Sequence, residues 1–415
     1  MLKRRINIVI LAVIILCSVS FYELSFLGSA MQKMAEILGG GIIFVLILFH
    51  LVYSNQKGIK RNFSVALLFI LLSLITSMIT SYAARDQRIV HTMFAQRAMY
   101  YYLLYFLLHQ LKFEPKDMEK VFVFFAVVYM GMHFLQTALY PRLITDGTVR
   151  AERGTVRIYI EGADYIALAF LLYLQKFLRS NNLKYLLLIF LVIAIYVMRG
   201  GRSAIAIQTL TVVLFVIIDR KVQSRIFLVM LGLIGSIAIF FIFQDIFGEL
   251  VNQSKTDMAK GEDYIRLKAI RYYMTEFNES HPIAYITGNG KAYPHSNYGK
   301  LIRLTTLKYR YYLSDIGLFG NYVFYGLFFI IGVLGICIRL LKLKIDPGQS
   351  YVKYYFIAVI IGITTSAAFA EADFICMMVC LLYLVDTSND ASLKNRESRL
   401  ENSTPKIKST IMQKA

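Results

Sequence analysis

Residues 318–341 read LFGNYVFYGLFFIIGVLGICIRLL, an apolar run whose single charged side chain, Arg339, lies close to its end. An α-helix needs about 20 mostly apolar residues to cross the hydrocarbon core of a membrane. Lipid offers no hydrogen-bond partners to an exposed backbone, so such a run must form a helix. This stretch therefore predicts one transmembrane helix.

The same pattern recurs along most of the chain. Apolar residues make up 57% of the 415 residues, charged residues make up 17%, and the mean hydropathy of +0.57 is far above that of a soluble globular protein. The sequence predicts an all-α polytopic membrane protein with about 12 transmembrane helices in one domain, residues 1–385, and no stretch alternates like an outer-membrane barrel. The other candidate spans are 6–21, 37–53, 63–82, 89–111, 121–140, 163–177, 183–198, 204–218, 226–243, 354–370 and 374–385.

Positive charge predicts the orientation. Lys3, Arg4 and Arg5 precede the first apolar run and no small-residue cleavage site follows it, so we interpret this run as a retained signal anchor. With a cytoplasmic N-terminus, the N-terminus and short cytoplasmic loops hold 19 Lys and Arg and the short outer loops hold 10. We therefore expect a multi-pass protein of the bacterial inner membrane with both termini in the cytoplasm. The net charge of +19 then reflects topology and membrane lipids as partners, and nucleic acid is not expected.

Two segments are expected outside the membrane. Residues 244–315 form one large non-cytoplasmic loop, and the polar tail, residues 386–415, is expected to be a disordered cytoplasmic extension. No strand–helix unit surrounds the G-x-G at Gly288–Gly290, which argues against a nucleotide site. The four cysteines fall inside apolar runs, and we interpret Cys376 and Cys380 as packing residues; no metal or cofactor is expected.

Arginines cluster in the short outer loops, against the positive-inside tendency. They fall in three groups: Arg85, Arg88 and Arg97; Arg150, Arg153 and Arg157; Arg199 and Arg202. A guanidinium holds phosphate through two parallel hydrogen bonds and does not lose its charge. The cluster indicates an anion site, and the alternative is that each arginine pairs with Glu152, Glu161 or lipid phosphate.

The large outer loop is rich in tyrosine. Residues Asp263–Phe277 carry apolar side chains at the spacing of an amphipathic helix. The tyrosines suit the apolar faces and hydroxyl groups of sugars, although they also suit a membrane interface. A lipid diphosphate is the usual activated donor outside the cytoplasm, and its transfer needs cations for the leaving group and a base for the incoming hydroxyl. The loop offers four candidate bases: His295, Asp315, Glu262 and Asp263.

Several motifs together resemble the O-antigen polymerase and O-antigen ligase family. Arg199-Gly-Gly-Arg-Ser-Ala resembles the motif that opens a span in that family, and Arg266 stands where the family has an arginine opening a helix. The other elements follow in the family's order: Thr287-Gly-Asn-Gly, His295-Ser-Asn-Tyr, and Ser314-Asp-Ile-Gly followed by Tyr325-Gly326. Gly201 replaces the usual Ser, Ser296 intervenes after His295, and Asp164 stands where Asn is common. These departures weaken the ligase interpretation most.

The resemblance implies a metal-independent glycosyltransferase that polymerises undecaprenyl-diphosphate-linked oligosaccharides into O-antigen, capsule or exopolysaccharide. It implies that Arg202 and Arg157, helped by Arg153, Arg199 and Arg266, bind the diphosphate. His295 or Asp315 would activate the acceptor, unless Asp315 caps the next helix, and Tyr298 would line the sugar groove. A flippase and a chain-length regulator protein are the implied partners. The alternatives are a ligase that transfers polysaccharide to the lipid A core, and a lipid-linked oligosaccharide transporter.

Overall fold

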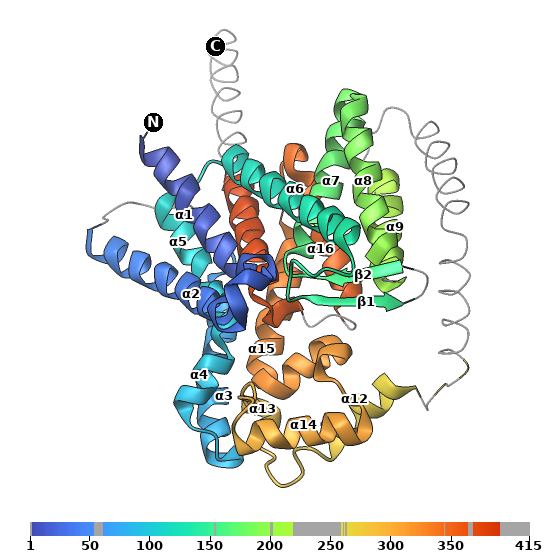
Figure 1. Ribbon diagram of the computed structural model, residues 1–415. Coiled ribbons are helices and arrows are strands. Elements are labelled where there is room, and N and C mark those ends of the chain that lie inside the picture. The colour runs from blue at the N-terminus through green and yellow to red at the C-terminus, as the bar shows by residue number, and fades with distance from the viewer. Residues whose placement is uncertain are drawn as a thin grey trace, which may run out of the picture.

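The computed structural model describes residues 2–53, 61–152, 155–199, 202–218, 264–343, 345–363 and 368–390, with residues 259 and 261. These residues form a helical bundle with one small antiparallel hairpin (Figure 1). The predicted span at 226–243 and most of the predicted tail lie outside the described residues.

The first half of the chain alternates long helices with short turns. Its helices are α1 (Leu2–Ser18), η1 (Ser20–Glu23), η2 (Ser25–Leu27), α2 (Gly28–Tyr53), α3 (Ser64–Arg85), α4 (Ile89–Ala95), η3 (Arg97–Leu103), α5 (Leu104–Leu111) and α6 (Pro115–Leu139). The hairpin β1 (Thr148–Glu152) and β2 (Thr155–Tyr159) precedes α7 (Ala163–Ser180), α8 (Leu183–Arg199) and α9 (Arg202–Ile218). Pro115 occupies the first turn of α6, where its missing N–H costs no hydrogen bond.

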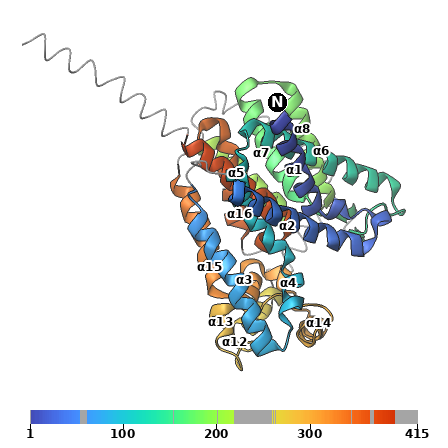
Figure 2. The same ribbon diagram turned by 90° about the vertical axis from the view of Figure 1, so that its left-hand side faces the viewer.

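The second half begins with short helices and ends with long ones. Its elements are α12 (Ile265–Thr275), α13 (Ala284–Thr287), α14 (Asn297–Tyr309), η5 (Leu313–Ile316), α15 (Gly317–Lys342), η6 (Pro347–Gln349), α16 (Ser350–Gly362), η7 (Ala368–Ala370) and a C-terminal helix, Ala372–Asp390. Figure 2 shows α3 and α15 running side by side from the bundle into a lobe made by α12, α13 and α14.

Five described helices are long and apolar enough to cross a membrane: Ser25–Leu51, Ser64–Arg85, Pro115–Leu139, Leu313–Lys342 and Ala372–Asp390. Along α3, large apolar side chains are exposed at helical spacing, among them Leu68 (56%), Ile75 (56%) and Ile79 (59%). Such a continuous apolar stripe is unfavourable in water and suits lipid. The expectation of a helical protein with membrane-spanning helices is thus confirmed, and the number of 12 spans stays a prediction.

Three features differ from the sequence expectation. The predicted span 89–111 is broken into α4, the 3₁₀ segment η3 and α5. In η3 the Tyr102 hydroxyl donates to the carbonyl of Phe369 at 2.9 Å, which ties this segment to the C-terminal part of the chain. The β1–β2 hairpin adds strand to an otherwise helical chain, and the C-terminal helix continues to Asp390 where the sequence predicts the tail to begin.

The C-terminal helix lies at the centre of the bundle (Figure 1). Its side chains from Phe374 to Val385 are at most 1% exposed, as expected for a helix that is apolar all round. The lobe has a smaller core of its own. That core consists of Ala269, Tyr273, Phe277, Tyr298, Leu313, Ile316 and Val323.

Segments predicted to be cytoplasmic meet at one end of the bundle. Arg4 donates to both carboxylate oxygens of Asp117, at 2.5 and 2.8 Å, and the Tyr351 hydroxyl donates to Glu119 at 3.1 Å. The start of α1 and the end of the described C-terminal helix lie at this end of the molecule in Figure 1.

Segments predicted to be on the outer side meet near the hairpin. The Ser25 N–H donates to the carbonyl of Ile144 at 3.0 Å, and the Gly162 N–H donates to Asp373 at 2.7 Å. Figure 1 shows the hairpin between the bundle and the lobe. The described loops therefore group at two ends in the way that the predicted alternation requires.

Candidate functional site

A kink in α15 connects the lobe to the bundle. Gly326 has φ +70°, and a Cβ there would collide with the carbonyl of Ile286, so only glycine fits. Gly288, also at positive φ, packs against the same place. The N–H groups of Asn289 and Gly290 donate to the carbonyls of Val323 and Phe324 at 3.0 and 2.7 Å. The Gly-Asn-Gly turn thus donates hydrogen bonds to backbone carbonyls of α15 at its kink.

Arg85 and Gln87, at the end of α3, hold the loop that follows this turn. Arg85 donates to the side-chain oxygens of Asn289 and Asn278 at 2.8 and 2.7 Å. Gln87, fully buried, donates to the carbonyl of Lys291 at 3.0 Å and accepts from the N–H of Tyr293 at 2.8 Å. Arg85 therefore has a structural role, and it does not belong to the predicted anion site.

The predicted loop residues lie in the lobe. His295 is exposed and its ring meets that of Tyr293 edge-on at 5.7 Å, and Asp315 is exposed in η5. Asp315 does not cap α15, because Ile316 is the N-cap residue of that helix and no side chain accepts a hydrogen bond from its first turn. Among the described residues, neither side chain makes a hydrogen bond or ion pair with Arg157 or Arg199. Arg266 lies half-buried in the first turn of α12.

Tyr298 is 2% exposed, and its hydroxyl has no hydrogen-bond partner among the described residues. Burial raises the pKa of this phenol, so the hydroxyl stays neutral. Tyr298 also lines a shallow open hollow at the end of α3, with Arg85, Asp86, Asn297 and Leu301 among its neighbours. The expected sugar-lining tyrosine therefore borders a surface hollow.

Two of the predicted arginines converge from separate elements. Arg157 on β2 and Arg199 at the end of α8 place their guanidinium carbons 5.1 and 5.8 Å from the centre of the Tyr159 ring. The Arg157 Nε donates to the carbonyl of Arg199 at 2.7 Å. Arg199 Nε is buried without a hydrogen-bond partner in the described part of the chain. Two like charges held this close favour an anion between or beside them.

The remaining predicted anion ligands are less defined. Arg202 opens α9, and its side chain lies outside the described part, as does Arg153. Arg150 stands opposite Arg157 in the register of the hairpin. Arg97 instead forms an ion pair with Glu36, Nε to Oε2 at 2.9 Å.

Buried polar groups surround Arg199 from the side of α6. Tyr129 and His133 are both 0% exposed, and the Tyr129 hydroxyl and both ring nitrogens of His133 have no hydrogen-bond partner among the described residues. Both interact electrostatically with Arg199. Buried polar groups are nearly always hydrogen-bonded in proteins, so such a set indicates a place that a ligand or water completes.

Carboxylates and cations extend from Arg199 toward the lobe and form one connected set, which we call the charged junction. Its members come from seven places in the chain and interact through hydrogen bonds, an ion pair or charge. They are Glu23, Glu36, Arg97, Glu161, Asp164, Arg199, Lys291, Glu371 and Asp373.

Most members of the charged junction have shifted pKa values, Glu161 and Lys291 among them. Burial, together with Asp373, Glu36 and Glu23, raises the pKa of Glu161 to about 9, so this carboxyl is largely protonated at neutral pH. Burial lowers the pKa of the Lys291 amine, although neighbouring carboxylates oppose that shift. Lys291 belongs to the loop that Gln87 holds, and it brings the large outer loop to the same place as the arginine of α8.

The backbone at the charged junction is strained. Ser20, Phe21, Tyr22 and Glu23 all have positive φ, between 48 and 56°. Left-handed conformation costs an L-residue about 1–2 kcal/mol. Strain of this kind gathers at functional sites, where the surrounding structure holds it in place.

Most of the charged junction is not predicted by the sequence pattern. Glu161 is expected there only as a partner for arginine, and no role is expected for Lys291, Glu371 or Asp373. The sequence does mark two of these residues as unusual, because Glu371 and Asp373 are the only charged residues between positions 354 and 385. Two carboxylates beside membrane spans indicate function.

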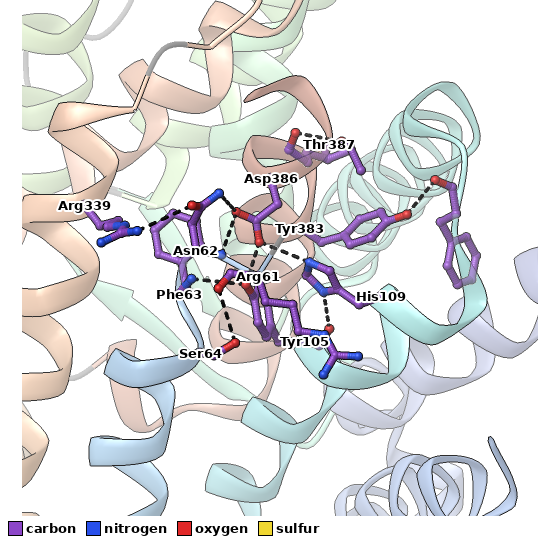
Figure 3. Close-up of polar contacts among 12 residues, drawn as sticks. Arg61, Asn62, Phe63, Ser64, Tyr105, His109, Arg339, Tyr383, Asp386 and Thr387 are labelled. Atoms are coloured by element: carbon purple, nitrogen blue, oxygen red, sulfur yellow. Dashed lines mark hydrogen bonds and ion pairs between the residues drawn. The ribbon is translucent and has the colours of Figure 1, made fainter. Parts of the chain in front are cut away.

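Figure 3 shows a second buried polar cluster, around Asp386 near the end of the C-terminal helix. Asp386, 0% exposed, accepts hydrogen bonds from Tyr105 at 2.5 Å and from the side-chain amide of Asn62 at 2.8 Å, and His109 lies 3.1 Å from it. The His109 ring also reaches the carbonyl of Tyr105 at 2.8 Å. Each polar group in this cluster has a hydrogen-bond partner within the cluster, so the cluster joins the start of α3, α5 and the C-terminal helix. None of these groups is left to bind a ligand.

No protein-family model matches the chain, and no curated protein is significantly similar to it.

Proposed function

We propose that this protein is a metal-independent glycosyltransferase that polymerises undecaprenyl-diphosphate-linked oligosaccharide repeat units on the outer face of the bacterial inner membrane. The observation that carries the proposal is the convergence of Arg157 and Arg199 on Tyr159 beside unpartnered buried donors. This is a place built for an anion at the level where the helices end. The ordered family-like motifs support the choice of a lipid diphosphate as that anion.

The proposed topology has about 12 spans with the N- and C-termini in the cytoplasm, and the lobe of α12, α13 and α14 faces outward. In this arrangement the donor lipid lies in the membrane beside the bundle, and its diphosphate reaches the arginines. Charge that develops on the departing diphosphate is stabilised by guanidinium groups, which replace the metal ion of other phosphate-transfer enzymes. Arg202 opens α9 directly after Arg199 and adds a further cation to this place.

The acceptor is a second lipid-linked repeat unit, and the growing chain moves onto its terminal hydroxyl. The lobe offers aromatic surface for the sugars of either substrate through Tyr298 and its neighbours. A ligase uses the same donor and the same leaving group, so the two activities differ in the acceptor. The Ser296 insertion after His295 favours polymerase, because the ligase branch depends most on that histidine.

The direct test is polymerisation by the purified protein in lipid nanodiscs, supplied with lipid-linked repeat units and analysed by gel mobility. We expect a ladder of longer products. Products that never exceed one repeat unit would refute the polymerase assignment. Deletion of the gene in cells separates polymerase from ligase: a lost polymerase leaves surface glycan with a single repeat, and a lost ligase leaves none and accumulates polymer on the carrier lipid.

Arg199→Lys tests the anion site. It keeps the positive charge but removes the bidentate fork, so we expect about a 10- to 100-fold loss of turnover, the effect of one or two charge-assisted hydrogen bonds. Arg142→Lys is the matched control, because Arg142 is exposed near the hairpin and its side chain makes no hydrogen bond or ion pair with another described residue. Equal activity of both variants would remove Arg199 from the mechanism.

A further inference from the structure

Glu371 differs from the other carboxylates of the charged junction. It is exposed, directly before the C-terminal helix, and its carboxylate has no hydrogen bond or ion pair within 4 Å among the described residues. It nevertheless interacts electrostatically with Asp373 and Lys291. It is thus a carboxylate that solvent or substrate can reach, and charged neighbours flank it.

Two of the other junction carboxylates already have partners. Glu36 is paired with Arg97, and Asp373 accepts from the N–H groups of Gly162 and Phe374 at 2.7 and 2.8 Å. Asp373 is thus held in place by the backbone. Of the junction carboxylates, Glu371 is the only exposed one, so it is the one that a substrate hydroxyl reaches most easily.

Two buried tyrosines point independently to a ligand at the charged junction. The hydroxyl of Tyr129, 0% exposed, lacks a partner and interacts with Arg199, Asp164 and Asp373. The hydroxyl of Tyr101, also 0% exposed, lacks a partner in the described part and interacts with Glu36 and Glu161. A buried hydroxyl without a partner costs about 1–3 kcal/mol, and a hydroxyl-rich ligand removes that cost.

We propose that Glu371 is the general base that accepts the proton of the acceptor sugar hydroxyl, with Lys291 and Asp373 positioning it. The inference rests on the proposed function and assigns the acceptor side of the same site. It moves the base from His295 and Asp315 in the lobe to the charged junction, where the arginine of α8 also lies.

The proposed step is balanced. The acceptor oxygen forms a bond to the anomeric carbon of the donor sugar as its proton passes to the Glu371 carboxylate. The bond between that carbon and the diphosphate oxygen breaks, and its electron pair leaves with the diphosphate. Arg157 and Arg199 stabilise the departing charge, and the proton on Glu371 is later released to water.

Lys291 connects this chemistry to the large outer loop. Its carbonyl is held by Gln87, and its amine interacts with Glu371, Glu161 and Glu36. Burial and the neighbouring Asp373 raise the pKa of Glu371, whereas the positive charge of this amine lowers it, and the outcome is a pKa of about 7. Asp373 is itself held in place by two backbone N–H groups.

The experiment uses the full chain in nanodiscs with two readouts, polymerisation of lipid-linked repeat units and binding of farnesyl diphosphate. Glu371→Gln preserves shape and removes the base, so we expect turnover to fall at least 100-fold while the Kd for farnesyl diphosphate stays within threefold. Glu371→Asp should recover part of the turnover. Glu279→Gln, an exposed carboxylate of the lobe, is the control and should match the unchanged protein.

Turnover of Glu371→Gln within threefold of the unchanged protein would overturn the inference. Loss of farnesyl diphosphate binding together with turnover would also overturn it, because the residue would then hold the donor or the fold. If the unchanged protein binds farnesyl diphosphate but makes no longer product, the proposed function fails and not the assignment of the base. Thermal unfolding of each variant checks that the fold is intact.

Discussion

Arginines of one predicted cluster have different tasks in the fold. Arg85 donates to Asn289 and Asn278 and fixes the outer loop, and Arg97 is neutralised by Glu36. Arg157 and Arg199 instead converge on one aromatic ring, that of Tyr159. The sequence indicates that arginines gather on the outer side. It cannot separate these tasks, because each depends on partners that are distant along the chain.

Glu161 supplies a prediction about pH. Its pKa is about 9 in the fold against an ordinary value of 4.5, so between these values the folded state binds more protons than the unfolded state. Stability from this group is therefore fully present below about pH 4.5 and is lost as pH rises toward 9. Glu161→Gln should raise stability at pH 8.5 by about 1–3 kcal/mol and leave it nearly unchanged at pH 4.5.

The measurement is the thermal unfolding midpoint of purified protein in detergent at the two pH values. Glu279→Gln serves as the control, because that carboxylate is exposed and its variant should show no pH-dependent difference. An equal shift of the Glu161→Gln midpoint at both values would mean that the carboxyl is not protonated in the fold.

At the scale of elements, most of the apolar runs became helices close to their expected ends. The amphipathic stretch in the outer loop is α12, and the last runs are α15, α16 and the C-terminal helix. The hairpin and the break in the fourth run were not expected. Hydropathy reports burial in lipid or protein, and it does not report the 3₁₀ turn that packs Tyr101 and Tyr102 or the pairing of residues 148–159.

The kink of α15 gives a prediction for an element. Gly326→Ala must place a methyl group against the carbonyl of Ile286 at a left-handed φ, so we expect a loss of about 2–4 kcal/mol of stability. Gly41→Ala in α2 is the matched control, because a Cβ there meets no atom within 4 Å. It should be neutral or stabilising, since alanine favours helix more than glycine does.

Denaturant or thermal unfolding in detergent compares the two glycine variants. If Gly326→Ala unfolds like the unchanged protein, then the docking of the Gly-Asn-Gly turn onto α15 does not hold the lobe. A loss confined to Gly326→Ala would show that a motif glycine is needed for backbone geometry, separately from catalysis.

At the scale of the molecule, loop charge and loop position agree. Described segments predicted to be cytoplasmic meet at the end of the bundle where α1 starts, and described segments predicted to be outside meet near the hairpin (Figure 1). Local composition predicts the side of the membrane for each loop. It is not enough to build the charged junction, since Lys291, Glu161 and Glu371 come from three distant loops and only tertiary packing brings them together.

Sidedness can be measured with single cysteines, because the four native cysteines are buried. Glu279→Cys in the lobe and Lys116→Cys at the start of α6 are both exposed positions. We expect a membrane-impermeant maleimide to label Glu279→Cys in cells with a permeable envelope, and Lys116→Cys only after the inner membrane is opened. The reverse pattern would invert the proposed topology and place the charged junction in the cytoplasm.

The buried Asp386 has a practical consequence for handling the protein (Figure 3). Its carboxylate receives donors from Tyr105 on α5 and from Asn62, just before α3, and two residues later the Ser388 hydroxyl accepts the N–H of Asp346 at 2.6 Å. The described C-terminal helix therefore makes buried contacts beyond Val385, where hydropathy predicts the span to end. A shortened protein or a fused reporter should be joined after Asp390, because a junction at residue 385 would remove the acceptor from a buried tyrosine and a buried histidine at once.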